Sequence, residues 1–250
     1  MKFANMTYDW GDRPDTEQML REIRETGWEG CETRLTADWM GMPDRVRELV
    51  KKTGCEIFCL SRETAPSDVD HWYMNVLQRL IEYADAIGVR NIMFFPSGRP
   101  WGRPPTNDEL GKFAEAAENL AKYAAKYGIT TSFHHHSNYM VETIAESEIV
   151  LNQTETLKLC LDCYHTHIFG EDFVEAYRKW KDRVHFVHVH DGNGLKLTDL
   201  GEGIVPVKES LEGIRDLGYD GWVVTHGGTT DRSPKEKSRI RRDYLKSIGF

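Results

Sequence analysis

Histidines gather in the second half of this chain. Of the 10 histidines, all but His71 lie at or after residue 134, and three are consecutive: His134, His135 and His136. A carboxylate, Glu142, follows this run within one loop. Imidazoles combined with carboxylates are typical ligands of divalent transition metals in proteins. The run therefore predicts one part of a metal site.

Further candidates lie at the ends of three later apolar stretches. Period-two alternation puts His188 and His190 on one face of their strand and His185 on the other. Asp162 ends another apolar strand, where a buried carboxylate is costly unless a cation balances it. His226 ends the last one. A single histidine or aspartate at a strand end is more often structural than a metal ligand. Here four neighbouring strands each supply such a residue, and this favours a shared cation.

The same alternation divides the triple histidine. His134 and His136 share one face of the strand, while His135 turns to the other face. At most two of the three can therefore meet a common metal. We expect His135 to be a packed or helix-capping histidine.

Other residues near predicted strand ends have two interpretations each. Arg34 and Arg62 either bind substrate or form surface ion pairs. Trp101 is either a lid that stacks on substrate or an anchor of its loop. Two loops, 192–196 with Lys196 and 227–230, either hold a substrate phosphate, as loops in these positions often do in barrel enzymes, or are plain turns.

The elements that must position these residues alternate regularly. Strands are predicted at 2–7, 29–33, 55–60, 91–96, 129–135, 157–162, 184–190 and 221–226. Helices are predicted at 15–25, 43–52, 69–87, 108–127, 141–151, 172–181, 207–217 and 234–248. Eight such units predict a (β/α)8 TIM barrel formed as a single domain by residues 1–250, with active groups at the C-terminal ends of the strands. A doubly wound open sheet is the alternative, but no Gly-rich phosphate loop follows the first strand.

Composition narrows the choice of partners and location. The net charge of −8 argues against a nucleic-acid partner. No apolar run approaches the roughly 18 residues of a membrane span, and the first ten residues carry no signal-peptide core, so we expect a cytoplasmic protein without a membrane partner. An odd count of five cysteines indicates reduced thiols. Cys160 and Cys163 should face opposite sides of a strand, which favours buried residues over a redox or zinc pair.

Several short motifs together indicate a family. They are Leu-Asp-Cys-Tyr-His at 161–165 with Gly-Glu-Asp at 170–172, Val-His-Val-His-Asp at 187–191, Leu-Gly-Glu-Gly at 200–203 and Gly-Tyr-Asp-Gly-Trp at 218–222. These resemble the LDxGH…aGxD, vHlKD, pGeG and GYdGw motifs of the xylose-isomerase-like barrels, the sugar isomerase/epimerase superfamily that also contains AP endonuclease family 2. Within it, residues 134–143 are similar to the HHHMGTVVET run of 2-keto-myo-inositol dehydratases.

The resemblance implies one divalent metal ion held by residues from strands five to eight. Asp162 and His188 match the family's ligand positions. Glu142 is the preferred ligand from strand five, with His134 as the alternative, and His226 stands where the family has a glutamate. Carboxylates and imidazoles together favour Mn, Co, Fe or Zn over Mg. His190 replaces the lysine of the family motif.

The activity implied by the resemblance is proton abstraction next to the carbonyl of a carbohydrate or cyclitol. Glu142 or His226 would take the proton, and His165 would act as the acid or as a donor to substrate. The substrate would also contact His134, His136, His190, Arg34, Arg62, Trp101 and Lys196. An enediolate isomerase or epimerase is the first interpretation, a dehydratase or other lyase at the same site the second.

Two further alternatives remain open. A non-catalytic sugar-binding barrel would result if the change at His226 abolished the chemistry. A DNA-repair endonuclease of the same superfamily would require three metals and a basic face that the sequence does not indicate. The oligomeric state is open as well, with a homo-oligomer as one option.

Overall fold

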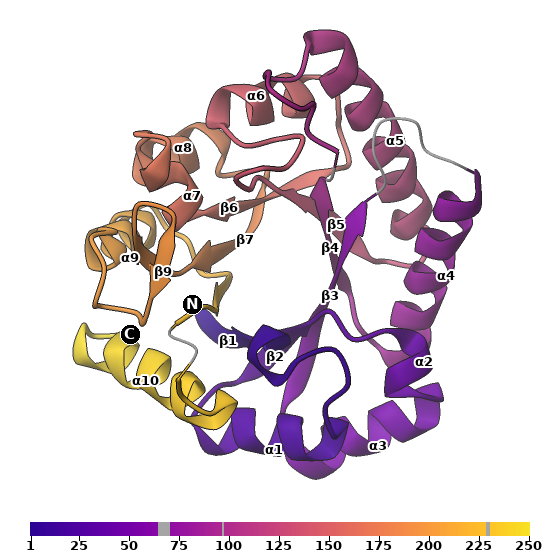
Figure 1. Ribbon diagram of the computed structural model, residues 1–250. Coiled ribbons are helices and arrows are strands. Elements are labelled where there is room, and N and C mark those ends of the chain that lie inside the picture. The colour runs from indigo at the N-terminus through magenta and orange to yellow at the C-terminus, as the bar shows by residue number, and fades with distance from the viewer. Residues whose placement is uncertain (65–70, 97, 229–230) are drawn as a thin grey trace.

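Eight parallel strands close into a barrel (Figure 1). The computed structural model describes residues 1–64, 71–96, 98–228 and 231–250. The strands are β1 (Lys2–Met6), β2 (Gly30–Thr33), β3 (Glu56–Thr64), β4 (Asn91–Pro96), β5 (Thr130–His134), β6 (Lys158–Asp162), β7 (Val184–Val189) and β10 (Trp222–Thr225). They pair in the order β1-β10-β7-β6-β5-β4-β3-β2. The predicted TIM barrel is confirmed, and the open sheet is excluded.

A ring of helices surrounds the barrel (Figure 1). Its members are α1 (Thr16–Glu25), α3 (Pro43–Thr53), α4 (His71–Ile87), α5 (Asn107–Ala125), α6 (Ile144–Asn152), α8 (Phe173–Trp180), α9 (Val207–Asp216) and α10 (Pro234–Ser247). Each lies where the sequence predicted a helix; residues 69 and 70 of one prediction fall outside the described residues. The ring closes where α10 packs beside α1. Among the described helices, none is long and apolar enough to cross a bilayer.

Five short elements were not predicted, and all lie in loops that follow strands. They are η1 (Thr7–Trp10), α2 (Ala37–Met40), α7 (Cys163–Ile168) and the antiparallel hairpin β8 (Asp191–Asn193) and β9 (Lys196–Thr198). Elements of three to six residues are too short to show a periodic pattern. Because they follow the C-terminal ends of the strands, they shape the barrel mouth.

Two apolar cores hold the fold together. The larger lies between the strands and the helices, and the smaller fills the barrel interior. Cys160 belongs to the inner core and Cys163 to the outer one, and all five cysteines are free and buried. The interpretation of the CxxC string as buried residues on opposite faces is confirmed.

His185 departs from simple alternation. The β6–β7 register pairs Leu159 with Val184 but Cys160 with Phe186, so His185 is an extra residue on β7. Its Nε2 lies 2.8 Å from Oδ1 of Asn91 on β4, a strand that is not a neighbour of β7 in the barrel. The prediction that His185 lies on the opposite face of its strand from His188 was wrong, because a bulge changes the direction in which side chains alternate.

Candidate metal and proton-transfer site

Asp162 lies at the centre of the barrel mouth, at the end of β6, and is fully buried. Its Oδ1 accepts a hydrogen bond from the backbone N–H of His165 (2.8 Å) and thereby caps α7. Its Oδ2 lies 3.2 Å from His134 Nε2 and 3.0 Å from His190 Nε2. Burial alone would raise the pKa of the carboxyl, but the surrounding histidines, His190 first, hold the pKa well below its ordinary value.

Two clusters around Asp162 have metal-ligand composition. Asp162, His190 and His226 place one potential ligand atom each within 4.8 Å of one another. His134, Cys160 and His188 do the same. In the first cluster one carboxylate joins two imidazoles, a set that suits Mn, Fe, Co or Zn.

Unpartnered atoms support the fit to a metal ion. Nδ1 of His134, His188 and His190 is buried, and no described residue forms a hydrogen bond with it. Buried polar atoms nearly always have a partner, so three orphaned nitrogens around one carboxylate need an explanation. The residues present therefore fit a divalent transition-metal ion. The assignment of His188 and His226 as ligands stays a prediction, and His190 joins them as a candidate ligand.

Glu32, at the end region of β2, is a site residue that sequence reasoning missed. The side chain is fully buried, and its Oε2 lies 2.8 Å from His188 Nε2. Its Oε1 is buried without a hydrogen-bond partner among the described residues. The signal was the one that identified Asp162, a carboxylate near the end of a short apolar strand, and it could have been applied to Glu32.

Glu142 is placed apart from these clusters. Its Oε2 pairs with Arg99 at 2.8 Å, and its Oε1 accepts a hydrogen bond from the backbone N–H of Asn138. Arg99 also bonds Glu146 and the carbonyl of Tyr139, so the loop after β4 ties down the loop after β5. The structure thus places Glu142 in a loop-stabilising ion pair, and its role as ligand or base stays a prediction.

His135 has a structural position. Its Nδ1 lies 3.1 Å from the carbonyl oxygen of Glu142, and its Nε2 accepts a hydrogen bond from the backbone N–H of Asp162 at 3.0 Å. These partners require a proton on Nδ1 and a lone pair on Nε2. The side chain is fully buried, as expected for a packed histidine, and it joins the loop after β5 to the end of β6.

The rings of His136 and His165 lie in contact, with centroids 3.9 Å apart and ring planes tilted by 47°. His136 donates from Nδ1 to the carbonyl of Ser137 (2.7 Å), which leaves the lone pair on its Nε2. His165 accepts at Nδ1 from the Ser137 N–H (3.4 Å), which puts the proton on its Nε2, a buried atom without a partner among the described residues. Burial lowers the pKa of His136 to about 4 and that of His165 well below its ordinary value. One ring can accept a proton, and the other can donate one.

A pocket of about 810 Å³ opens over the barrel mouth. Its lining includes His136, His226, Arg34 and Lys196, four residues that the sequence assigned to the site. The Arg34 guanidinium lies over the Phe95 ring, 5.2 Å from its centroid. The pocket can therefore present polar and charged groups to a small molecule from several loops.

Two predicted substrate contacts, Trp101 and Arg62, are not among the residues that line this pocket. Trp101 is fully exposed in the loop after β4, so its ring does not anchor that loop by burial. Arg62 donates to the carbonyl of Ser61 at 3.3 Å.

Two loops were predicted as possible phosphate-binding loops. In the loop 227–230, Thr229 and Thr230 lie outside the described residues. Lys196 is exposed on β9.

Asp191 fixes the loop after β7. Its carboxylate accepts four backbone hydrogen bonds at 2.8–3.1 Å, from Gly192, Gly201, Gly203 and Val205. A Cβ at Gly203 would lie 2.1 Å from Asp191 Oδ1, so only glycine fits this close approach. The Leu-Gly-Glu-Gly motif at 200–203 therefore has a structural role, because its backbone surrounds the Asp191 carboxylate.

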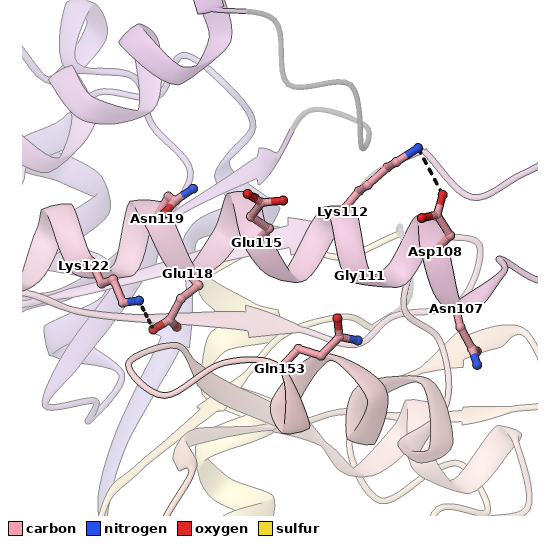
Figure 2. A pocket seen from close by; sticks show the side chains of 9 residues that line it. All are labelled: Asn107, Asp108, Gly111, Lys112, Glu115, Glu118, Asn119, Lys122 and Gln153. Atoms are coloured by element: carbon pink, nitrogen blue, oxygen red, sulfur yellow. Dashed lines mark ion pairs between the residues drawn. The ribbon is translucent and has the colours of Figure 1, made fainter.

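A second groove, of about 570 Å³, lies on the outer helices rather than at the mouth (Figure 2). Figure 2 shows polar side chains along α5 with Gln153 of α6, and ion pairs from Lys112 to Asp108 and from Lys122 to Glu118. Both oxygens of the Glu118 carboxylate accept backbone hydrogen bonds, among them those from Thr156 and Leu157. Four of the charged groups in this groove are therefore engaged in ion pairs, and Glu118 also holds backbone N–H groups, which indicates a structural surface.

Comparison with known proteins decides the family. The xylose isomerase-like TIM barrel family matches residues 20–248, nearly the whole chain. The chain belongs to this family. The resemblance predicted from the motifs is confirmed.

Relatives in sequence include dehydratases. An inosose dehydratase from Lacticaseibacillus casei is 28% identical over 164 residues, covering 56% of this chain and 55% of the relative. The rhizopine catabolism protein MocC from Rhizobium meliloti is 26% identical over 246 residues, covering 86% and 74%. The chain thus spans about half the length of the curated dehydratase that it matches.

Solved structures share the fold at low identity. An L-ribulose 3-epimerase has a TM-score of 0.84 at 16% identity, covering 99% of this chain and 94% of that one. The 3-keto-D-glucoside 4-epimerase YcjR from E. coli has a TM-score of 0.79 at 20% identity, covering 99% and 98%. The IOLI protein, whose crystal structure holds a zinc atom, has a TM-score of 0.82 at 16% identity, covering 99% and 98%.

Proposed function

We propose that this protein is a divalent-metal-dependent enzyme that removes water from a keto-sugar or keto-cyclitol. The observation that carries the proposal is the contact between the rings of His136 and His165, which have complementary tautomers close to Asp162. The similarity to inosose dehydratase supports the same reaction class. The zinc atom of the IOLI protein supports a metal at the barrel mouth.

Asp162, His190 and His226 are the proposed metal-holding residues, with His188 as a further ligand. A divalent ion bound there would polarise the carbonyl oxygen of the substrate, which makes the neighbouring C–H more acidic. Asp162 contributes the negative charge, and the imidazoles contribute neutral donors, because burial lowers the pKa of His226 well below its ordinary value. Mn, Co, Fe and Zn are the candidate ions.

His136 is the proposed base. Its Nε2 carries a lone pair, and the ring lines the pocket. With a pKa of about 4, the ring is neutral at pH 7 and can take the proton from the carbon next to the carbonyl. The C–H electron pair then forms a C=C bond as the C–O bond to the β-hydroxyl breaks.

His165 is the proposed acid. Its Nε2–H is buried without an acceptor among the described residues, and an oxygen of the substrate would satisfy it. It would give its proton to the departing hydroxyl, which leaves as water, and the proton taken by His136 would then restore the neutral His165 ring. Because the two ring centroids are only 3.9 Å apart, base and acid would lie on the same side of the substrate, which suits elimination. An epimerase would need proton donors on opposite faces of one carbon.

An isomerase or epimerase at the same site is the second candidate, supported by the fold shared with the epimerases. The two reactions are separated by incubating keto-sugars and inosones with metal-loaded protein in deuterated water. Elimination gives a product lighter by one water, which mass spectrometry detects. A product of unchanged formula that carries deuterium at one carbon would replace the dehydratase with an isomerase or epimerase. Binding without either change would leave a non-catalytic barrel.

A further inference from the structure

We propose that Glu32 is a positioning residue of the metal centre, which holds His188 in the tautomer that presents Nδ1 to the metal ion. This inference rests on the proposed metal-dependent function and names the atom through which β7 would contribute to it. It also brings a second carboxylate, from β2, into a site whose proposed ligands come from β6, from β7 and the residue after it, and from the residue after β10.

The contact between the two side chains determines the tautomer. Glu32 Oε2 lies 2.8 Å from His188 Nε2, and both side chains are fully buried. An ionised carboxylate only accepts hydrogen bonds, so Nε2 must carry the proton. In the neutral ring the lone pair is then on Nδ1, the atom that has no partner among the described residues. Metal-ligating histidines usually donate their other N–H to such a carboxylate.

Charge balance points the same way. Among the described residues, the only hydrogen-bond partner of the Glu32 carboxylate is His188, which contacts Oε2; Oε1 has no partner. If His188 is neutral, the buried negative charge of Glu32 has no counterion in this contact, which is costly in a protein interior. A cation on Nδ1 of His188 would balance that charge through the ring.

Two other buried carboxylates show what a purely structural role looks like in this chain. Asp191 accepts four backbone hydrogen bonds, and Glu118 uses both oxygens to accept backbone N–H groups. Glu32 accepts none from the backbone of the described residues and instead faces a histidine with an open nitrogen. Glu32 is therefore placed as a carboxylate that orients a metal-ligating histidine would be.

The first experiment compares metal affinity in Glu32→Gln and Glu118→Gln. Zn²⁺ affinity is measured by competition with a chromophoric chelator, and folding is checked by circular dichroism. We expect Glu32→Gln to bind Zn²⁺ about 10- to 100-fold more weakly than the wild type, the usual effect of losing such a carboxylate. Glu118→Gln, which loses a buried carboxylate on the outer helix α5 (Figure 2), should stay within about twofold. Glu32→Asp should restore part of the loss.

The second experiment needs only the wild-type chain. In metal-free protein with ¹⁵N-labelled histidine, the His188 ring should show a proton on Nε2, and in ¹¹³Cd-loaded protein the cadmium should couple to its Nδ1. Coupling to Nε2, or no coupling to His188, would overturn the inference. This readout stands even if Glu32→Gln does not fold.

The outcomes separate this inference from the proposed function. If the wild type binds none of the candidate metals, the proposed function fails, and this inference fails with it. If the wild type binds metal but Glu32→Gln binds it equally well, only the role of Glu32 is refuted. Equal weakening in Glu118→Gln would mean that any lost buried carboxylate disturbs the site, which also refutes the positioning role.

Discussion

The ring of His136 lies 3.9 Å, centroid to centroid, from the ring of His165, and Ser137 bonds both rings through its backbone. The Ser137 carbonyl accepts from one ring, while its N–H donates to the other. One residue thereby sets both tautomers. Among the described residues, neither ring forms a hydrogen bond with a carboxylate, so the backbone of Ser137 alone orients the pair.

The first prediction tests this pair. His136→Gln and His165→Gln should each lower kcat by about 10²- to 10⁴-fold, because each removes one positioned proton-transfer group. Metal content, measured by elemental mass spectrometry, should stay near that of the wild type. His167→Gln, on the same helix as His165, is the matched control and should keep its turnover. Wild-type kcat in either variant would remove that histidine from the mechanism.

The second prediction concerns the central carboxylate. Asp162→Asn should lose most of its bound metal, because the substitution removes the negative charge that His134 and His190 contact. Metal content before and after chelation is the measurement. Asp172→Asn, which changes the capping residue of α8, should keep its metal and lose at most about 1 kcal/mol of stability. A metal-free wild type that no ion stabilises would refute the centre altogether.

Glu142 provides the third prediction. Because its carboxylate pairs with Arg99 and the Asn138 N–H, Glu142→Gln should keep its metal and lose about 1–3 kcal/mol in unfolding free energy. Urea unfolding and elemental analysis give the two values. If the variant instead loses its metal at unchanged stability, Glu142 is the ligand that the family resemblance implies, and the ion pair with Arg99 must open on metal binding.

The fourth prediction concerns pH. Burial, with a smaller contribution from Lys158, lowers the pKa of His185 from 6.5 to about 4. Between these values the unfolded chain binds a proton that the folded chain does not, so this histidine makes the protein less stable as pH falls from about 6.5 to 4. In metal-free protein, the unfolding free energy of His185→Gln should fall less steeply with decreasing pH than that of the wild type. The slopes should differ by the effect of about one proton, ~1.4 kcal/mol per pH unit. Parallel curves for variant and wild type would contradict the shift.

Local patterns predicted most of the fold. Apolar runs bounded by glycine can be recognised from a few consecutive residues. The same holds for a carboxylate or an imidazole at a strand end, such as Asp162 and His226. Long-range pairings had no such signal. Arg99 meets Glu142 across 43 positions in the sequence, and Glu32 meets His188 across 156. The tautomers of His136 and His165 depend on the backbone of Ser137, which only the folded loop fixes.

The bulge at His185 shows the limit of alternation. Period-two reasoning holds while each residue of a strand pairs with one on its neighbour, and it put His188 and His190 on one face, where both rings lie near His226. One extra residue on β7 invalidated it for His185 alone. Nothing in the local sequence marks that residue as extra, because the bulge arises from how β6 and β7 fit around the barrel.

The four hydrogen bonds around Asp191 divide the loop after β7 into parts that should differ in their tolerance to engineering. Gly201 and Gly203 donate to Asp191 at places where an added Cβ would clash, so insertions between residues 199 and 205 should disrupt the mouth. The hairpin tip at Gly194 and Leu195 is exposed. Loop tips of this kind accept added residues most readily. Substrate range could thus be redesigned by extending the tip, a few residues from Lys196, while the fold around Asp191 stays intact.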